Sequence, residues 1–507
     1  MTAQRVPALR MLATRWPALV LVVAAASLRL FHVATAYDIH VDEVSYTKLA
    51  GSVAAGDGVL LDDKPFFLHP PMFFWVLGGL IRILGSPGLL SEEILALRPL
   101  NIALSVITCA ALIAMVERAT TKKIGLVAGA LFAVDAFAIR FDSRLFLETA
   151  AMTFTALAYL VLIKGGDRPV PGRARAITAG LLFGCATLTK DTALIVFAPA
   201  LLAALATGRA LPRRSAVLTL ATAGAVYVVY LLSLLLAGDF AAFFSEKTSG
   251  FRRLTGADQP TGFDRANGPT LGDRLIANLS EFSASYAMIA LGSIAALFIV
   301  SELWRTRGAR ADARLLLCFW QLSAVLYLAY AKLFGTLEEQ MFYFLLIPSV
   351  TTICIAGMLL ASEPRTARWV RPALVKPVLL AATVMILVSS LTAWYHVHTT
   401  TSNGYASAVD YFERELPAGT TVAVTEDVGQ FLLPNVRLGV WTKPDDFRRQ
   451  GVDYVLISTQ LIAQGYGTAT PALADYLARN ATTAGRWRSS QDNFLVLYAL
   501  EHPISSR

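Results

Sequence analysis

The stretch WPALVLVVAAASLRLFHVATAYDIHVDEV, residues 16–44, decides the class of fold. Its mostly apolar part, 17–36, has about the twenty residues that a helix needs to cross the hydrocarbon core of a bilayer. Asp42 and Glu43 follow closely, so two adjacent carboxylates lie at the mouth of the expected span. We interpret the run as an uncleaved first helix and not as a signal peptide, because it continues past its small residues and many further spans follow.

The composition is typical of a polytopic membrane protein. Of the 507 residues, 55% are hydrophobic and 16% are charged, and the mean hydropathy is +0.56. A soluble protein carries about a quarter charged residues. The net charge of +8 does not indicate nucleic acid, because the basic residues form short clusters between apolar runs, as in cytoplasmic loops. All four cysteines lie within apolar runs, so no disulfide is expected.

The apolar runs predict an all-α transmembrane domain over residues 1–395. We expect eleven spans, at roughly 17–36, 97–116, 124–141, 146–163, 176–190, 192–207, 216–237, 284–303, 315–333, 342–361 and 377–395. Every second loop is basic, which predicts a multi-pass protein of the cell membrane with a cytoplasmic N-terminus. After an odd number of spans, the C-terminal tail is extracytoplasmic.

Two large loops and this tail then lie outside. Loop 37–96 contains FFLHPPMFFWVLGGLIRIL, which is too interrupted for a span and predicts an amphipathic segment in the interface. Loop 238–283 is polar and glycine-rich, and we expect its middle to be mobile. The tail, 396–507, has four β-rich runs and two runs with helical spacing, so it predicts a small α/β domain. We hypothesise that this domain covers the membrane part and selects the acceptor.

Polar residues that are unexpected in such a chain gather at the outer ends of the spans. They are Asp42, Glu43, His69, Asp142, Arg144, Glu148, Lys190, Asp191, Glu338, Glu339 and Gln340. Charges at membrane depth usually line a cavity or pair with one another. Cations here suit an anionic group, and a carboxylate suits a reacting hydroxyl, so a lipid-linked phosphosugar meets both needs. Neither a P-loop nor a dinucleotide-binding motif is visible.

Several of these signals also have plainer interpretations. Acids at a helix exit are usually solvated, Arg144 and Glu148 are spaced for an intrahelical ion pair, and Lys190 is placed to snorkel to the interface. His40 and Asp42 have a spacing that could begin a metal site, but no second histidine pair has ligand spacing. We therefore assign no cofactor and leave a divalent cation open.

The sequence resembles the C-type (GT-C) family of lipid-dependent membrane glycosyltransferases that includes the aminoarabinose transferase of lipid A and the protein O-mannosyltransferases. Over about residues 20–207 the matching stretches are DEVSYTKLAGSVAAGDGVL, HPPMFFWVLGGL, ALRPLNIALSVIT, DSRLFLETAAMTF and GLLFGCATLTKDTALIVFAPALL. The resemblance implies the GT-C fold and a polyprenyl-phosphate sugar donor. It also implies that Asp42 is the catalytic base or its positioner, that Glu148 is a second acid and that Lys190 lies near the donor.

The chain departs from the family at one position. Close relatives of the aminoarabinose transferase have lysine before the Pro-Pro pair, where this chain has His69. A neutral histidine binds phosphate less well than lysine, so a phosphate role at His69 is expected to depend on pH.

We therefore predict an enzyme that transfers a sugar from polyprenyl phosphate to an acceptor hydroxyl, on a glycan, lipid or protein, at the extracytoplasmic face and with inversion. The expected partners are this donor, this acceptor and membrane lipids, and not nucleic acid. A membrane transporter or flippase for a lipid-linked saccharide is the alternative. It is disfavoured because we see no inverted repeats and because the acids, apart from Asp135, lie at span ends. The candidate catalytic residues are Asp42, Glu43 and Glu148, and the candidate donor-phosphate ligands are Arg144, Lys190 and His69.

Overall fold

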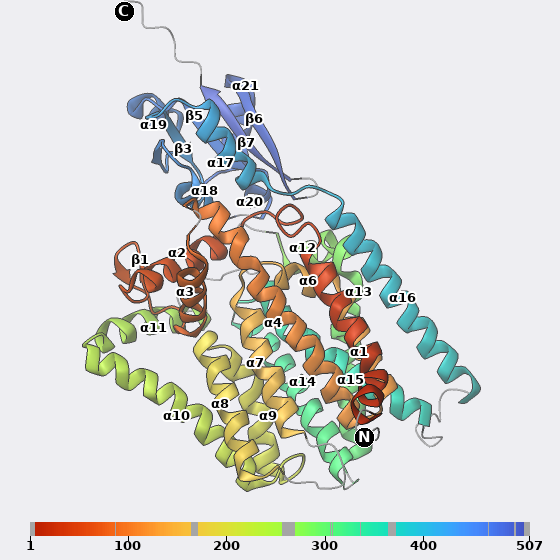
Figure 1. Cartoon of the computed structure of the whole chain (residues 1–507). Helices are drawn as coiled ribbons and strands as arrows, with labels where there is room; N and C mark the ends of the chain where they lie inside the picture. Colours follow the sequence, from red (N-terminus) through yellow and green to blue (C-terminus); the bar gives the residue numbers. More distant parts are fainter. Residues whose placement is uncertain are drawn as a thin grey trace, which may run out of the picture.

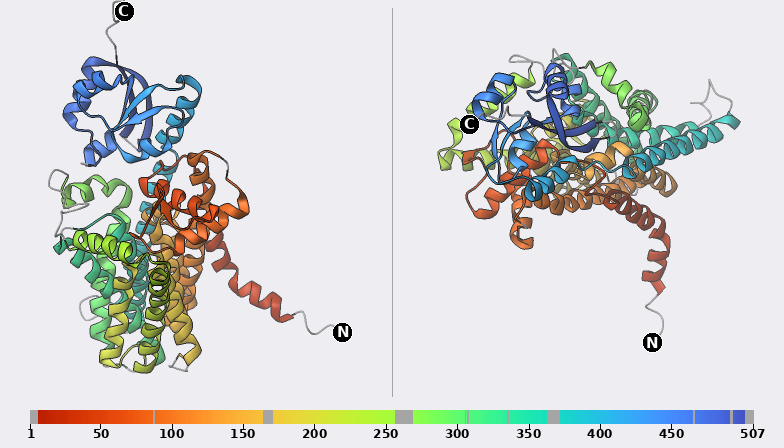
Figure 2. Two further views of the ribbon diagram at one scale, coloured as in Figure 1. Left: turned by 90° about the vertical axis from the view of Figure 1, so that its left-hand side faces the viewer. Right: turned by 90° about the horizontal axis from the view of Figure 1, so that it is seen from above.

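The computed structural model describes residues 6–86, 88–163, 171–255, 269–304, 306, 308–334, 336–362, 372–464, 466–490 and 493–500. A bundle of long helices carries a small sheet domain at one end (Figure 1). The N-terminal part of the first helix projects sideways from the bundle, away from the sheet domain (Figure 2).

Each expected apolar run overlaps a helix or a pair of helices, although the first helix ends at Leu30 and not at residue 36. The elements are α1 (Val6–Leu30), α4 (Leu90–Ala119), α5 (Lys122–Val134), α6 (Ala136–Asp142), α7 (Leu147–Leu162), α8 (Arg173–Thr189), α9 (Ala193–Thr207), α10 (Arg213–Ala237), α13 (Leu279–Leu303), α14 (Ala309–Leu333), α15 (Gln340–Ser362) and α16 (Pro372–His398). Among the described residues, six helices are long and apolar enough to cross a membrane, or seven if α5 and α6 form one span. A multi-pass membrane protein is confirmed in this sense, while the number of eleven spans and their orientation stay predictions.

The expected span at 124–141 is bent by 64° between α5 and α6. The break falls at Asp135, whose Oδ1 accepts a hydrogen bond from the Ala138 backbone N–H at 2.7 Å and so caps α6. Its Oδ2 accepts from the Ser285 hydroxyl of α13 at 2.6 Å. A capping carboxylate of this kind satisfies backbone groups that a broken helix would leave unpaired, so the bend persists.

Close helix packing in the bundle depends on small residues. On α8, an added Cβ at Gly180 would lie 2.5 Å from Thr222 Cβ, and one at Gly184 would lie 2.6 Å from Val226 Cβ. Both partners lie on α10. Glycine at these two positions allows the backbones of α8 and α10 to approach closely, as small residues do between membrane helices.

Both outer loops contain helices. Loop 37–96 folds as α2 (Val41–Ala55), a small hairpin of β1 (Leu60–Leu61) and β2 (Lys64–Pro65), and α3 (Met72–Leu84). Phe73, Leu77 and Ile81 of α3 are buried, while the apolar side chains of Trp75 and Ile83 are exposed. The expected place of this segment in the membrane interface stays a prediction. Loop 238–283 contains α11 (Phe240–Leu254) and α12 (Leu271–Ala277). The centre that we expected to be mobile, 245–268, begins within α11, and its residues 256–268 lie outside the described residues.

The tail forms a five-stranded sheet in the order β4-β3-β5-β7-β6. The strands are β3 (Thr421–Val424), β4 (Arg437–Gly439), β5 (Tyr454–Ser458), β6 (Ala481–Ser490) and β7 (Asn493–Leu500). Strand β3 pairs in parallel with β4 and β5, whereas β7 pairs antiparallel with β5 and β6. The four β-rich runs therefore form strands as predicted. Strand β6 was not predicted, because ATTAGRWRSS is polar and becomes a strand by pairing with β7.

Five helices accompany this sheet. They are α17 (Gly404–Glu415), α18 (Asp427–Leu432), α19 (Pro444–Gln450), α20 (Thr459–Gln464) and α21 (Pro471–Asn480). Helices α17 and α21 are the two that the spacing predicts.

The sheet domain and the outer loop of the membrane part share one hydrophobic core. Buried Val44 and Leu49 of α2 belong to the same cluster as Val428 of α18 and Leu497 of β7. Figure 1 shows α18 next to α2. The boundary that we expected at 395/396 stays a prediction, because this core extends across it.

Candidate active site

The candidate site is built around the first turn of α2. His40 caps the helix, its Nδ1 accepting from the Asp42 backbone N–H at 3.3 Å, while the Glu43 carboxylate accepts from the His40 N–H at 3.1 Å. This reciprocal capping box begins the helix at Val41 and holds both acids in its first turn. Burial and the nearby Arg144 lower the pKa of His40 to about 4, so its ring is neutral and Nδ1 is available as an acceptor.

Glu43 is committed to the interior of the protein. Its carboxylate forms a bidentate pair with Arg98 of α4, with Nε–Oε1 at 2.9 Å and Nη2–Oε2 at 2.8 Å. It also accepts from the Leu145 backbone N–H at 3.1 Å. Both side chains of the pair are fully buried. Burial opposes ionisation of Glu43, but Arg98 outweighs it, so the pKa of Glu43 is lowered. The carboxylate is left with little capacity to contact a substrate.

Arg98 also holds the loop that leads into α2. Its Nη1 donates to the carbonyls of Val33 at 2.7 Å and Tyr37 at 3.0 Å, and its Nη2 donates to that of Asp38 at 3.3 Å. One buried guanidinium thus joins the end of the first span to the first turn of α2.

Asp42 differs from its neighbour in both exposure and partners. Its side chain is 30% exposed, and among the described residues it forms no ion pair with a lysine or arginine. Burial and the nearby Glu148 raise the pKa of Asp42 to about 6, while Lys190 opposes the shift. This carboxylate is thus accessible, ionised at neutral pH and more basic than an ordinary aspartate.

Glu148 and Lys190 form a buried ion pair beside Asp42. Glu148 lies in the first turn of α7, and Lys190 directly follows α8. Lys190 Nζ donates to Glu148 Oε1, and Glu148 Oε2 is buried without a hydrogen-bond partner. An ammonium group has three donors, so one contact to Glu148 leaves Lys190 able to donate further. The intrahelical pair between Arg144 and Glu148 that their spacing allowed is not formed.

Glu338 and Tyr46 complete this group. Glu338 lies just before α15, and burial raises its pKa although Lys190 opposes this. Asp42 and Glu148 both act electrostatically on Glu338 and on Tyr46. Lys190 therefore contacts Glu148 and acts electrostatically on Asp42 and Glu338, two carboxylates from other parts of the chain. Tyr46 was missed, although it lies four residues after Asp42 and hence on the same face of α2.

Arg144 lies on another side of the site, at the loop between α6 and α7. Its guanidinium stacks over the Tyr37 ring at 4.9 Å, and its buried Nε has no hydrogen-bond partner. Within the described part of the chain it forms no ion pair. Burial and the nearby Arg140 lower the pKa of Arg144 to about 10, which still leaves it charged at neutral pH. Arg140 is paired, with Glu339 at 2.7 Å.

The His69 ring packs against two aromatic rings, with centroid distances of 6.0 Å to Tyr46 and 6.1 Å to Phe66. The preceding residue, Leu68, accepts a hydrogen bond from Lys247 of α11 at 2.9 Å. The loop that carries His69 is thus tied to the second outer loop.

Asp142, another of the polar residues predicted at the outer ends of the spans, connects helices of the bundle. Its carboxylate accepts from Arg29 at 2.9 Å, Ser105 at 2.5 Å, Thr149 at 3.1 Å and Tyr343 at 2.6 Å. All of these side chains except Thr149 come from helices other than α6 and α7, so this acid joins α1, α4 and α15.

Within the described residues, no three His, Cys, Asp or Glu side chains are arranged so that they could hold a metal ion. His40 directs Nδ1 to the backbone of its own helix, so a metal site that begins with His40 and Asp42 has no third protein ligand there.

Comparisons with known proteins agree with this architecture. The family model of dolichyl-phosphate-mannose-protein mannosyltransferase matches residues 68–234. The structure of ArnT from Cupriavidus metallidurans bound to undecaprenyl phosphate is similar, with a TM-score of 0.57 at 13% identity over 96% of this chain and 98% of that chain. The resemblance to the C-type membrane glycosyltransferases is confirmed.

A second solved structure has the same fold. It is the oligosaccharyltransferase AglB from Archaeoglobus fulgidus in complex with an inhibitory peptide and a dolichol-phosphate, with a TM-score of 0.56 at 12% identity over 89% of this chain and 70% of that chain. Comparison with curated protein sequences found no match. At these identities the solved structures establish the fold, whereas roles for Asp42, Glu43, Glu148, Arg144, Lys190 and His69 stay predictions.

Proposed function

We propose that this chain transfers a sugar from a polyprenyl-phosphate donor to an acceptor hydroxyl at the extracytoplasmic face of the membrane, with Asp42 as the general base. The observation that carries this proposal is the contrast within the acidic pair. Glu43 is held in a buried ion pair with Arg98. Asp42 is partly exposed, has no lysine or arginine ion-pair partner in the described chain and has a raised pKa. A base with these properties suits removal of a proton from a hydroxyl.

In the proposed step the acceptor oxygen attacks the anomeric carbon as its proton passes to Asp42. The bond from the anomeric carbon to the phosphate oxygen breaks, and the electron pair leaves with the prenyl phosphate. One direct displacement inverts the anomeric configuration. Negative charge then grows on the phosphate, where preorganised cations are most effective.

We assign that charge stabilisation to Arg144 and Lys190. Arg144 is a cation without a carboxylate partner among the described residues, and Lys190 retains donors beyond its contact with Glu148. In this proposal Glu148 is a second acid that orients Lys190, and His69 is a peripheral, pH-dependent phosphate contact. The fold, the mannosyltransferase family model and the prenyl-phosphate complexes of the two similar structures support a lipid-linked donor.

The deciding experiment incubates the purified protein with a panel of polyprenyl-phosphate sugars and measures release of free prenyl phosphate. We expect release with at least one donor, and its loss in Asp42→Asn. Movement of an intact lipid-linked saccharide across vesicles without release would contradict the proposal and support a flippase.

A further inference from the structure

One face of α11 contacts the loop between β2 and α3. Phe243, Glu246 and Lys247 have the i, i+3 and i+4 spacing that places side chains on the same side of a helix. The Phe243 ring packs edge-on against the Phe67 ring at a centroid distance of 6.0 Å. Glu246 Oε2 accepts from the Phe67 backbone N–H at 2.8 Å, and Lys247 Nζ donates to the Leu68 carbonyl at 2.9 Å. One apolar contact and two polar ones therefore hold α11 against this loop.

The Lys247 ammonium group has a second partner on the turn after α8. It forms an ion pair with Asp191, whose other carboxylate oxygen accepts from the Tyr227 hydroxyl of α10 at 2.9 Å. The side chains of this pair are partly exposed, by 21% for Lys247 and by 35% for Asp191. A single side chain of α11 thus joins the loop between β2 and α3 to the turn after α8.

A small hydrophobic cluster supports this connection. Phe67 and Phe243 are buried in the same cluster as Leu188 and Tyr230. Leu188 lies on α8, two residues before Lys190, and Tyr230 lies on α10. Because the cluster packs the loop, α8, α10 and α11 together, the ion pair is held in one geometry although it is partly exposed.

The two partners of Lys247 are chain neighbours of two proposed donor-phosphate contacts. Leu68 directly precedes His69, and Asp191 directly follows Lys190. An ammonium group that donates to a carbonyl and to a carboxylate at once restricts the distance between these two acceptors. We propose that Lys247 is a positioning residue that sets the spacing between His69 and Lys190 at the donor phosphate. This inference rests on the proposed function.

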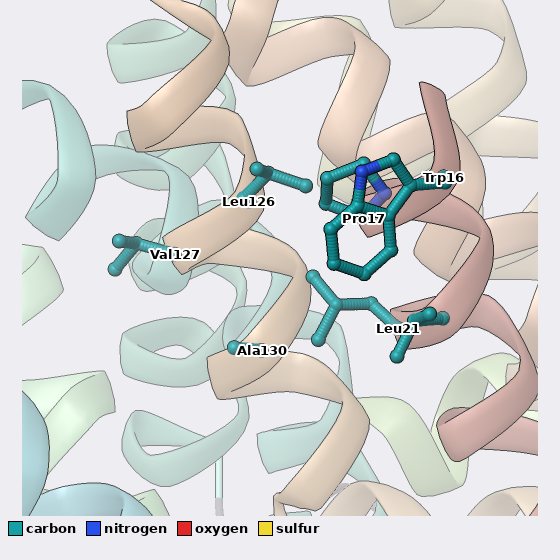
Figure 3. A pocket seen from close by; sticks show the side chains of 7 residues that line it. Trp16, Pro17, Leu21, Leu126, Val127 and Ala130 are labelled. Atoms are coloured by element: carbon teal, nitrogen blue, oxygen red, sulfur yellow. The ribbon is translucent and has the colours of Figure 1, made fainter. Parts of the chain in front are cut away.

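The open apolar surface between α1 and α5 does not compete with this region for the phosphate. Leu21 of α1 and Leu126 and Ala130 of α5 are among its lining residues (Figure 3). None of the described residues that line it is charged. It therefore supplies no cation for an anionic group, in contrast to the region of His69 and Lys190.

The test measures binding of undecaprenyl phosphate by native mass spectrometry, together with the KM for the sugar donor. Lys247→Met removes both contacts and should weaken donor binding roughly tenfold, because a displaced cation loses part of its charge-assisted hydrogen bond to the phosphate. The KM for the acceptor and the midpoint of thermal unfolding should stay near wild type, since Asp191 keeps its bond with Tyr227. Lys247→Arg should retain most of the affinity, because a guanidinium also donates to a carbonyl and a carboxylate.

Two further variants complete this set. Lys64→Met replaces an exposed lysine of β2 in the same outer loop, and as the matched control it should bind undecaprenyl phosphate like the wild type. Asp191→Ala breaks the connection from its other end and should give the same loss as Lys247→Met. The test therefore stands even if one of these two variants does not fold.

A double-mutant cycle separates positioning from packing alone. A His69→Gln protein has no imidazole to position, so Lys247→Met should weaken binding of undecaprenyl phosphate by a smaller factor there than in the wild type. A purely structural role of Lys247 predicts equal factors, so equal factors would overturn the inference. Wild-type affinity in Lys247→Met would overturn it as well.

The same measurements distinguish this inference from the proposed function. If the wild type neither binds undecaprenyl phosphate nor releases prenyl phosphate from any donor, the proposed function fails and the role of Lys247 fails with it. If the wild type binds and releases the lipid while the Lys247 and Asp191 variants are unchanged, the positioning role alone is wrong.

Discussion

Arg98 and Glu43 form a fully buried, bidentate ion pair although 55 residues separate them in the chain. The same guanidinium holds the carbonyls of Val33, Tyr37 and Asp38. The pair therefore fixes the loop from which α2 starts. Asp42 directly precedes Glu43 in the first turn of α2, so its position is fixed as well. We infer that Arg98 and Glu43 are positioning residues and that Asp42 is the reactive one.

Removing one partner of this pair should destabilise the protein strongly. Glu43→Ala leaves Arg98 buried without its counter-ion, which typically costs about 3–5 kcal/mol. We expect a large fall in the midpoint of thermal unfolding. Glu43→Gln keeps the shape of the side chain, so its midpoint of thermal unfolding should fall less. The control is Glu413→Gln, at an exposed position of α17. An unfolding midpoint for Glu43→Ala equal to that of Glu413→Gln would contradict a stabilising role of the Arg98–Glu43 pair.

Asp42→Asn should reduce kcat by at least about a hundredfold, because asparagine keeps the shape of aspartate but does not accept the proton. Expression, unfolding midpoint and donor affinity should stay close to wild type. If Asp42→Asn retains more than about a third of the turnover, the base is another residue and Glu148 becomes the next candidate.

The pH dependence of the wild type tests the same residue. A base acts in its ionised form, so activity should be lost as the pH falls through the pKa of Asp42, which burial and Glu148 raise to about 6. We expect the acidic limb of kcat/KM against pH near 6. Glu148→Gln removes the neighbouring negative charge and should move this limb to lower pH. A limb near 4 in the wild type would show that the base is an unperturbed carboxylate.

The two proposed phosphate contacts should differ in their effect on stability. Arg144→Ala removes a cation without an ion-pair partner in the described chain, so it should weaken donor binding by roughly ten- to a hundredfold, about 1.5–3 kcal/mol, with little unfolding. Lys190→Ala should weaken donor binding and also destabilise the protein, because Glu148 loses its buried partner. The double variant Lys190→Ala with Glu148→Gln should recover stability but not donor affinity. If Arg144→Ala has the donor kinetics of the wild type, Arg144 does not contact the donor phosphate and has only a packing role.

A buried carboxyl at the joint with the sheet domain predicts a pH effect on stability. Asp38 accepts from the Tyr405 backbone N–H at 3.0 Å, and burial raises the pKa of Asp38 to about 7. Its pKa is lower in the unfolded chain, so the folded state binds more protons, and this carboxyl costs progressively more stability as the pH rises from about 4 to 7. The unfolding midpoint of the wild type, relative to Asp38→Asn, should therefore fall between pH 5 and pH 8. A constant difference would contradict the raised pKa.

Much of the architecture could be predicted because hydropathy is a local property. A run such as 342–361 forms a helix within a bilayer, because a helix satisfies the backbone hydrogen bonds inside the segment itself. The acidic pair after the first span was visible for the same reason. Strand β6 was not visible, since ATTAGRWRSS has neither alternation nor high strand propensity and is held by its pairing with β7.

The roles of the charged side chains required the tertiary structure. Local pattern shows Asp42 and Glu43 as two adjacent acids, and only the resemblance points to Asp42 as the base. The tertiary structure adds the physical difference, because Arg98 of α4 pairs with Glu43. Likewise, Lys190 could have paired with Asp191, snorkelled or remained free, and its partner Glu148 is 42 residues away. Local pattern determines where helices form and which residues lie at their ends. The pairing of buried charges depends on which helices meet, because the electrostatic energy is decided by distance in space and by burial, not by separation along the chain.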